Sequence, residues 1–188
     1  MRGALTFIVG GARSGKSARA EQLAARGGRV LYVATAEGRD EEMRSRIAAH
    51  RAARPDHWDT LEEPLHLAGA LRSVHHRYDT VLIDCLTLWV SNLLLDRQPG
   101  TASGGDLEER ILISTRELLD VCAGSRAHWI VVSNEVGLGV VPPSPLGRAY
   151  RDALGRVNQA VAARAGEVCL MVAGLPVQIN PPARGDVE

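Results

Sequence analysis

The sequence predicts an α/β fold: a mostly parallel sheet with helices on both faces and one antiparallel strand at an edge. Two observations lead to this prediction. Short apolar segments alternate with longer helical segments along the 188 residues, a pattern typical of consecutive β-α-β units. The first apolar segment, residues 5–9, runs into a glycine-rich loop and then a helical stretch over residues 17–26, which is the order of a phosphate-binding loop. We therefore predict a single-domain P-loop NTPase fold for residues 1–188.

The glycine-rich loop matches the phosphate-binding pattern G-x-x-x-x-G-K-[ST] at every specified position. Backbone N–H groups of such a loop, together with the positive end of the following helix, point at phosphate oxygens. Lys16 is expected to reach the terminal phosphates from an exposed position, and the Ser17 hydroxyl to complete a Mg²⁺ shell. The loop residues predicted to bind nucleotide are Gly10, Gly11, Ala12, Arg13, Ser14, Gly15, Lys16 and Ser17.

A second apolar strand is expected at residues 30–34, where it closes the first β-α-β unit. Ligands of open α/β sheets bind at the carboxyl ends of strands, so Thr35 either faces the nucleotide or caps the loop with its hydroxyl. A helix is predicted over residues 40–54, because acidic residues occupy its first turn and a proline follows it. His50 and Arg54 share one face of this helix.

The middle of the chain contains a second nucleotide-binding signal. A weak strand is predicted at residues 58–61 and a helix at residues 64–75. The apolar segment 79–84 then ends in a carboxylate, Asp84. This arrangement is typical of a Walker-B strand, which delivers an aspartate beside the phosphate loop to hold Mg²⁺. Asp84 is therefore the second predicted metal ligand, after Ser17.

The remaining elements complete the alternation. Helices are predicted over residues 86–95, 106–122 and 146–164, strands over 128–133, 168–172 and 177–179, and a flexible loop over 96–105. The connection between the last two strands is too short for a parallel crossover, so one of them is expected to run antiparallel at the sheet edge. Asn134 and Glu135 follow a strand end, and we assign them to substrate or nucleotide binding.

The composition excludes several classes of function. Basic and acidic residues number 22 each, so no overall field favours nucleic acid or a membrane surface. Aromatic residues make up only 4% of the chain, which argues against a surface for stacking bases. Three separated cysteines without a C-x-x-C pair indicate a reduced compartment instead of a disulfide or zinc framework. The first strand leaves no room for a signal peptide, so we expect a cytoplasmic protein without membrane insertion.

Missing motifs narrow the class of phosphate-loop protein. A GTPase switch would place D-x-x-G after the second nucleotide-binding strand, but here Asp84 is followed by Cys85-Leu86-Thr87, and no N-K-x-D motif occurs. Molecular motors and transporter ATPases need further segments that a chain of this length lacks. The class of phosphate-loop protein that remains is a compact enzyme that acts on a small molecule.

Motifs over nearly the whole chain follow a more specific pattern. They are GGARSGKS at residues 10–17, YVATA at 32–36, DEEM at 40–43, LIDCLTLW at 82–89, SNEVGLGVVP at 133–142 and GRVNQ at 155–159. In this order and spacing, and with His50 within the segment 46–58, they resemble the bifunctional adenosylcobinamide kinase/adenosylcobinamide-phosphate guanylyltransferase family. The tail departs from the family, whose members often end in Ile-Lys where this chain has Ile179-Asn180.

The resemblance implies two reactions. Adenosylcobinamide is phosphorylated by ATP or GTP, and GMP is then transferred from GTP to that phosphate, giving adenosylcobinamide-GDP and pyrophosphate. It also implies that His50 carries GMP as a covalent intermediate, and the arginines near it are candidates to bind pyrophosphate. Similar proteins form small rings, which implies a homotrimer. The further positions matched to nucleotide binding are Ala34, Thr35, Ala36, Arg51, Ala52, Ala53, Arg54, Glu62 and Asp84.

Two other interpretations stay open at this point: a small-molecule kinase without the guanylyl-transfer step, and a non-catalytic nucleotide-binding switch. Without the family resemblance, His50 would be interpreted as a half-buried histidine on an amphipathic helix, with its arginines as a solvated face. The other histidines are interpreted as structural: His57, His66, His75, His76 and His128.

Overall fold

The computed structural model describes residues 3–38, 41–52, 54–96 and 104–179. A seven-stranded sheet has the order β3-β2-β4-β5-β1-β6-β7, and six of its strands run parallel. The strands are β1 (Leu5–Gly10), β2 (Val30–Ala34), β3 (Asp59–Glu62), β4 (Thr80–Asp84), β5 (His128–Asn134), β6 (Glu167–Val172) and β7 (Leu175–Ile179). The predicted α/β fold class is confirmed, and so is the antiparallel edge strand, because β7 pairs with β6 in that direction.

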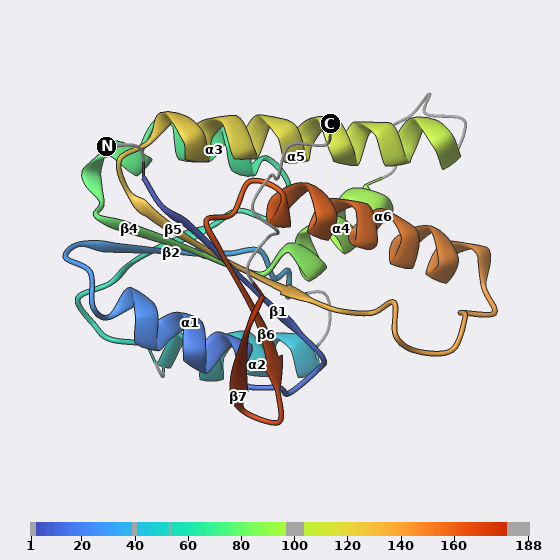
Figure 1. Cartoon of the computed structure of the whole chain (residues 1–188), viewed down its shortest axis with the longest axis horizontal. Coiled ribbons are helices and arrows are strands. Elements are labelled where there is room, and N and C mark those ends of the chain that lie inside the picture. Colours follow the sequence, from blue (N-terminus) through green and yellow to red (C-terminus); the bar gives the residue numbers. More distant parts are fainter. Residues whose placement is uncertain (1–2, 39–40, 53, 97–103, 180–188) are drawn as a thin grey trace, which may run out of the picture.

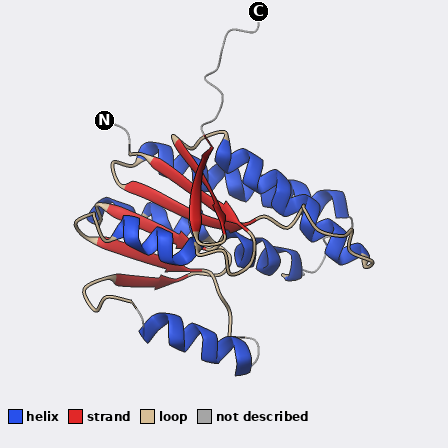
Figure 2. Cartoon of the chain, turned by 60° about the horizontal axis from the view of Figure 1, so that its bottom comes forward, coloured by secondary structure: helices blue, strands red, loops and turns tan. Residues whose placement is uncertain are grey.

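Helices cover both faces of the sheet (Figures 1 and 2). They are α1 (Lys16–Ala24), α2 (Glu41–Ala52), α3 (Leu67–Arg72), α4 (Leu86–Leu95), α5 (Gly104–Gly124) and α6 (Pro145–Ala162), with one 3₁₀ turn at His75–Arg77. Figure 1 shows α1 and α2 on one side and the other four helices on the opposite side. None of these helices, within the ranges described, is both long and apolar enough to cross a bilayer.

The sheet is buried on both faces, which explains why its central strands read as continuous apolar segments. Phe7 and Val9 of β1 pack into the larger core, beneath α3 to α6. Ile8, between them, packs into the smaller core with Ala20 and Ala24 of α1. Successive strand residues point to opposite faces, so a single strand supplies side chains to both cores.

The structure differs from the predicted elements mainly after Pro64. Helix α3 begins only at Leu67, because Glu63 Oε1 accepts hydrogen bonds from the backbone N–H groups of Leu65 (3.0 Å) and His66 (2.8 Å) and forms a turn first. Most of the predicted 96–105 loop lies outside the described residues. The other elements match the predicted ranges to within a few residues at each end.

The parallel strands bring their carboxyl ends to one edge of the sheet. Gly10, Ala34, Asp84 and Asn134 are the last residues of β1, β2, β4 and β5. In the register of the sheet, Gly10 is level with Asn134, and Ala34 is level with Asp84. Four segments that are far apart in the sequence therefore end beside one another.

Candidate functional site

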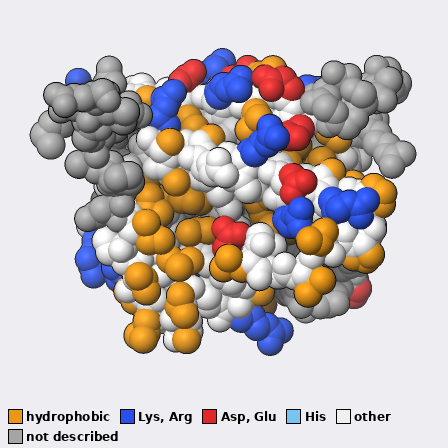
Figure 3. Space-filling view, turned by 45° about the vertical axis from the view of Figure 1, so that its right-hand side comes forward, with side chains coloured by type: hydrophobic (Ala, Val, Ile, Leu, Met, Phe, Trp, Pro, Cys, Tyr) orange, Lys and Arg blue, Asp and Glu red, His pale blue; other side chains and the backbone are white. Residues whose placement is uncertain are grey.

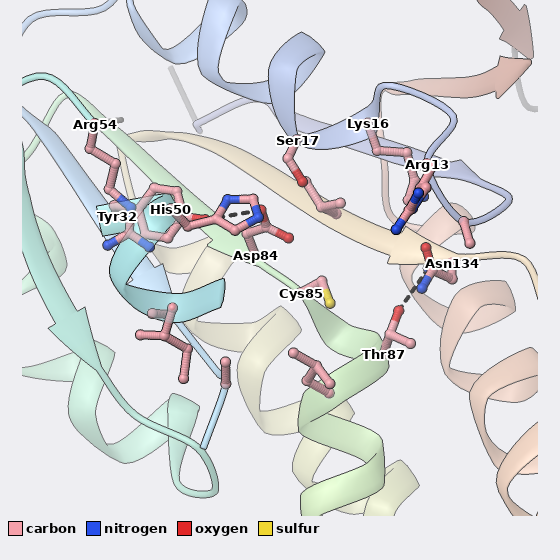
Figure 4. A pocket seen from close by; sticks show the side chains of 16 residues that line it. Arg13, Lys16, Ser17, Tyr32, His50, Arg54, Asp84, Cys85, Thr87 and Asn134 are labelled. Atoms are coloured by element: carbon pink, nitrogen blue, oxygen red, sulfur yellow. Dashed lines mark hydrogen bonds between the residues drawn. The ribbon is translucent and has the colours of Figure 1, made fainter. Parts of the chain in front are cut away.

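A pocket of about 360 Å³ lies at these strand ends. Its lining includes ten of the predicted site residues, which come from the phosphate loop and from the ends of β2, α2, β4 and β5 or the residues just after them (Figure 4). They are Ala12, Arg13, Lys16, Ser17, Ala34, Ala36, His50, Arg54, Asp84 and Asn134. Figure 4 shows His50, Tyr32 and Arg54 at one end of the pocket, Arg13 and Asn134 at the other, and Ser17 and Asp84 between them.

The phosphate loop has the backbone shape that its glycines allow. Gly15 precedes α1 with a φ of 93°, a left-handed conformation that side chains with a Cβ disfavour. At Gly10, a Cβ would lie 2.5 Å from the carbonyl oxygen of Met171 in β6. The loop also contacts the β6–β7 hairpin, because Gly174 N–H donates to the Ser14 carbonyl over 3.1 Å. The loop conformation thus depends on close approach to the last two strands.

Lys16 is buried, with 7% of its surface exposed, so the expectation of an exposed lysine is wrong. Its Nζ donates to the Gly11 carbonyl over 2.5 Å and contacts Ser14 Oγ at 3.4 Å. Burial lowers the pKa of Lys16, and the nearby Cys85 and Asp84 oppose that shift. The ammonium group is therefore turned back over the loop, where phosphate oxygens bind in this type of loop.

Asp84 is held by a tyrosine that the sequence analysis did not identify. Tyr32 Oη donates to Asp84 Oδ2 over 2.9 Å, and the Arg54 guanidinium carbon lies 3.5 Å from the centre of the Tyr32 ring. Burial raises the pKa of Tyr32, and the charge of Asp84 raises it further, so the phenol stays protonated and keeps donating. The alternation of β2 could have identified Tyr32, since Tyr32 and Ala34 point to the same face.

Thr35 does not line the pocket, although it was predicted to bind nucleotide or to cap a loop. The side chain is fully buried. Its Oγ1 donates to the Cys85 carbonyl over 2.7 Å and accepts from the Cys85 N–H over 2.9 Å. Asn92 Nδ2 in turn donates to the Thr35 carbonyl over 2.8 Å. Thr35 thus ties the end of β2 to the residue that follows Asp84.

Glu21 is a second residue that the sequence analysis missed. It lies one helical turn after Ser17 on the same face of α1. Burial raises its pKa first, the charge of Asp84 raises it further, and His50 and Arg54 act in the opposite direction. Glu21 is therefore close to the groups at the His50 end of the pocket, and the i, i+4 spacing from Ser17 was the available signal.

The structure does not bring every predicted residue into the pocket. Arg51 lies on the exposed side of α2, where its Nη1 forms an ion pair of 3.4 Å with Oε1 of Glu62. Ala52 is also exposed, and Ala53 lies outside the described residues. The Glu135 side chain accepts a hydrogen bond from the Gly137 N–H within its own turn.

The pocket contains a donor set that fits a hard divalent cation. Asp84 supplies a carboxylate and Ser17 a hydroxyl, and both line the same cavity. Mg²⁺ prefers oxygen ligands and usually retains several waters beside one or two protein groups. The tyrosine bond occupies only Oδ2 of Asp84.

Apolar side chains are exposed beside the pocket as well. After Asn134 the chain enters a segment in which Leu138 and Val140 are 89% and 95% exposed. The β6–β7 hairpin next to the phosphate loop exposes Leu175 and Val177. Figure 3 shows apolar side chains gathered on this side of the molecule.

Comparisons of the sequence with known proteins agree on one family. A family model described as cobinamide kinase / cobinamide phosphate guanyltransferase matches residues 6–179. A bifunctional adenosylcobalamin biosynthesis protein (CobP) of Pseudomonas aeruginosa is 51% identical over 176 residues, which are 93% of this chain and 96% of that protein. Proteins of the same description (CobU) from Escherichia coli and Salmonella typhimurium are 41% and 40% identical over 180 residues, covering 94% of this chain and 99% of each. The crystal structure of the RadB recombinase superposes with a TM-score of 0.48 and 16% identity over 90% of this chain and 74% of that one.

Proposed function

This chain belongs to the cobinamide kinase / cobinamide phosphate guanyltransferase family, and we propose that one pocket serves both of its reactions. The protein is a bifunctional enzyme of adenosylcobalamin biosynthesis, with nucleoside triphosphates as co-substrates. One observation carries the proposal: His50, which comes from α2, lines the same cavity as Lys16 and Asp84. A nucleotide bound at the phosphate loop therefore has a histidine within the same site.

For the kinase reaction, the loop amides and Lys16 hold the terminal phosphates of ATP or GTP. Phosphoryl transfer depends mainly on positioning and on neutralising charge, with little covalent participation by the protein. Lys16 is suited to this because the loop already holds its ammonium group beside the Gly11 carbonyl. Phosphate oxygens replace that carbonyl as the partner when nucleotide binds.

For the guanylyl transfer, a neutral imidazole nitrogen of His50 attacks the α-phosphorus of GTP. Arg54 lies at the His50 end of the pocket, so we assign its charge to the α-phosphate, and not to the departing pyrophosphate considered in the sequence analysis. We give Arg51 no phosphate contact, because its guanidinium pairs with Glu62 outside the cavity.

We also propose that Ser17 and Asp84 hold Mg²⁺. The ion would neutralise charge on the phosphates when bound. The role of this chain is to present the Asp84 carboxylate in a fixed orientation, which the bond from Tyr32 supports. Asp84→Asn should then require a higher Mg²⁺ concentration for half-maximal rate in both reactions. Coincident Mg²⁺ titrations of the variant and the parent would show that Asp84 has a structural role only.

The central test separates the two activities through His50. His50→Ala should still phosphorylate adenosylcobinamide but should form no adenosylcobinamide-GDP. The parent, incubated with α-labelled GTP and Mg²⁺, should retain label on His50 and release pyrophosphate. The label should be lost in acid and kept in base, because protonation makes imidazole a good leaving group. His57→Ala is the matched control, since His57 is exposed and lies outside the pocket.

Three results would contradict this assignment. Label mapped to a residue other than His50 would exclude the covalent role. Formation of adenosylcobinamide-GDP by His50→Ala at the parent rate would exclude it too, and an unlabelled parent that still phosphorylates would favour a kinase without the second step.

We further propose that residues 1–188 fold as one domain, that the chain assembles as a homotrimer and that it works in the cytoplasm. The trimer follows from the family resemblance alone. Light scattering coupled to size exclusion would give its mass directly, and a monomeric mass at micromolar concentration would contradict it.

A further inference from the structure

Asn134 is held by hydrogen bonds on both sides of its backbone. Its N–H donates to Oγ1 of Thr87 over 2.8 Å, which Figure 4 shows as a dashed line. Its carbonyl accepts from Nδ2 of Asn158 in α6 over 3.0 Å. Oδ1 of Asn158 in turn accepts from the buried Ser133 hydroxyl over 2.7 Å. Two helices that pack on the same face of the sheet therefore fix the last residue of β5.

The side chain of Asn134 has no such partner. Its amide lines the pocket and makes no hydrogen bond to any residue in the described part of the chain. Arg13 is at the same end of the pocket (Figure 4) and pairs with no carboxylate among the described residues. An amide with two N–H donors and a guanidinium are together a complementary pair for phosphate oxygens.

The geometry of double displacement indicates which phosphate these groups meet. When His50 attacks the α-phosphorus, pyrophosphate leaves from the opposite side. The second nucleophile must break the P–N bond, so it enters opposite His50, from the side that pyrophosphate has left. In this pocket that side is the end formed by the phosphate loop and Asn134 (Figure 4).

We propose that the side-chain amide of Asn134 binds the phosphate of the acceptor in the second reaction, together with Arg13. Thr87 and Asn158 are positioning residues, which act by holding the Asn134 backbone. The inference rests on the proposed function, because it places the acceptor relative to a guanylylated His50. It narrows the sequence-based assignment of Asn134, which was substrate or nucleotide binding, to the acceptor.

The bonds in this step balance without a further reactant. An oxygen of cobinamide phosphate attacks the α-phosphorus, and a P–O–P bond forms as the P–N bond to His50 breaks. The electron pair of that bond returns to the ring nitrogen, and the imidazole becomes neutral again. Asn134 donates hydrogen bonds to the phosphate throughout and exchanges no proton.

The experiment measures the two half-reactions separately in purified full-length enzyme. Self-guanylylation with GTP and Mg²⁺ involves no acceptor, whereas transfer from the labelled enzyme to adenosylcobinamide phosphate does. Asn134→Ala should self-guanylylate within about twofold of the parent, and its KM for adenosylcobinamide phosphate should rise about tenfold or more. Asn134→Asp, in which the side chain keeps nearly the same size, should raise this KM further than Asn134→Ala does, because the added charge repels the phosphate.

Adenosylcobinamide itself provides the internal comparison, since its reacting group is an uncharged hydroxyl. Asn134→Asp should raise the KM for this acceptor less than the KM for the phosphorylated one. Asn158→Leu should raise the KM for adenosylcobinamide phosphate, by a smaller factor than Asn134→Ala, without a matching loss of self-guanylylation. Gln159→Ala, an exposed neighbour on α6, is the control and should leave both half-reactions unchanged.

The outcomes distinguish failure of this inference from failure of the proposed function. A parent that never self-guanylylates would overturn the proposed function. A labelled parent together with an unchanged KM in Asn134→Ala and Asn134→Asp would overturn only the acceptor site. Loss of self-guanylylation in proportion to loss of transfer would assign Asn134 to the nucleotide or to the fold, and would also overturn it.

Discussion

Tyr32 Oη donates a hydrogen bond of 2.9 Å to Oδ2 of Asp84. The two residues come from β2 and β4, which are neighbouring parallel strands. The same tyrosine ring lies beneath the guanidinium of Arg54, which follows α2. One side chain thus connects the proposed Mg²⁺ carboxylate with the segment that carries His50.

Tyr32→Phe should keep the ring under Arg54 and remove only the hydrogen bond to Asp84. A hydrogen bond to a charged group contributes about 1.5–3 kcal/mol, and Asp84 is partly accessible, so we expect unfolding free energy to fall by about 1–2 kcal/mol. The Mg²⁺ concentration for half-maximal kinase rate should rise, because the carboxylate loses its fixed orientation. Urea denaturation and Mg²⁺ titration measure the two effects. An unchanged Mg²⁺ dependence would remove Tyr32 from the metal site.

Arg51, in the last turn of α2, and Arg54, which follows α2, form a matched pair of variants. Arg54→Ala removes a cation that lines the pocket, and its guanylylation rate should fall about tenfold or more. Arg51→Ala removes a surface ion pair with Glu62, and such pairs contribute little, so its rate should stay within about twofold of the parent. Initial rates of label incorporation from α-labelled GTP measure both. Equal losses in the two variants would place Arg51 in the nucleotide site as well.

Lys16→Met should abolish kinase activity without lowering stability. Because burial lowers the pKa of Lys16 below its ordinary value, the charged form is less favourable in the folded state than in the unfolded one. The positive charge on Lys16 therefore lowers the free energy of unfolding at neutral pH. This loss is recovered as the pH rises from the folded pKa of Lys16 to the ordinary lysine pKa of 10.5. We expect the thermal midpoint of the variant at pH 7 to equal or exceed that of the parent. A large drop in the thermal midpoint would show that the hydrogen bond from Lys16 to the Gly11 carbonyl stabilises the fold more than burial of the charge destabilises it.

Glu21→Gln should raise stability at neutral pH and have no such effect in acid. The pKa of Glu21 is raised in the folded state. As the pH rises past the ordinary value of 4.5, Glu21 therefore ionises in the unfolded chain before it ionises in the folded protein, and the free energy of unfolding falls. The ionised carboxylate is then a destabilising group at pH 7. Thermal midpoints measured from pH 4 to pH 8 should diverge with rising pH, whereas those of Glu117→Gln, an exposed control on α5, should follow the parent. If the thermal midpoints of Glu21→Gln and the parent changed in parallel with pH, the buried environment inferred for Glu21 would be contradicted.

The sequence by itself determined the fold class, the glycine-rich loop between β1 and α1, the aspartate that ends β4, and the family. These features depend on local patterns. The glycines of the loop match a backbone that few other residues adopt, and buried parallel strands appear as continuous apolar segments. For this reason β2 and α4 coincide with the predicted ranges 30–34 and 86–95.

Only the tertiary structure decided which way individual side chains at the strand ends point. Thr35 turns toward Cys85 and away from the pocket, and Lys16 is buried instead of exposed. Tyr32 bonds to a residue 52 positions away, and Asn158 holds a residue 24 positions away. Contacts over such separations follow from the order in which parallel strands are placed in the sheet, and that order is set by packing of the two cores, which no local pattern in the sequence encodes.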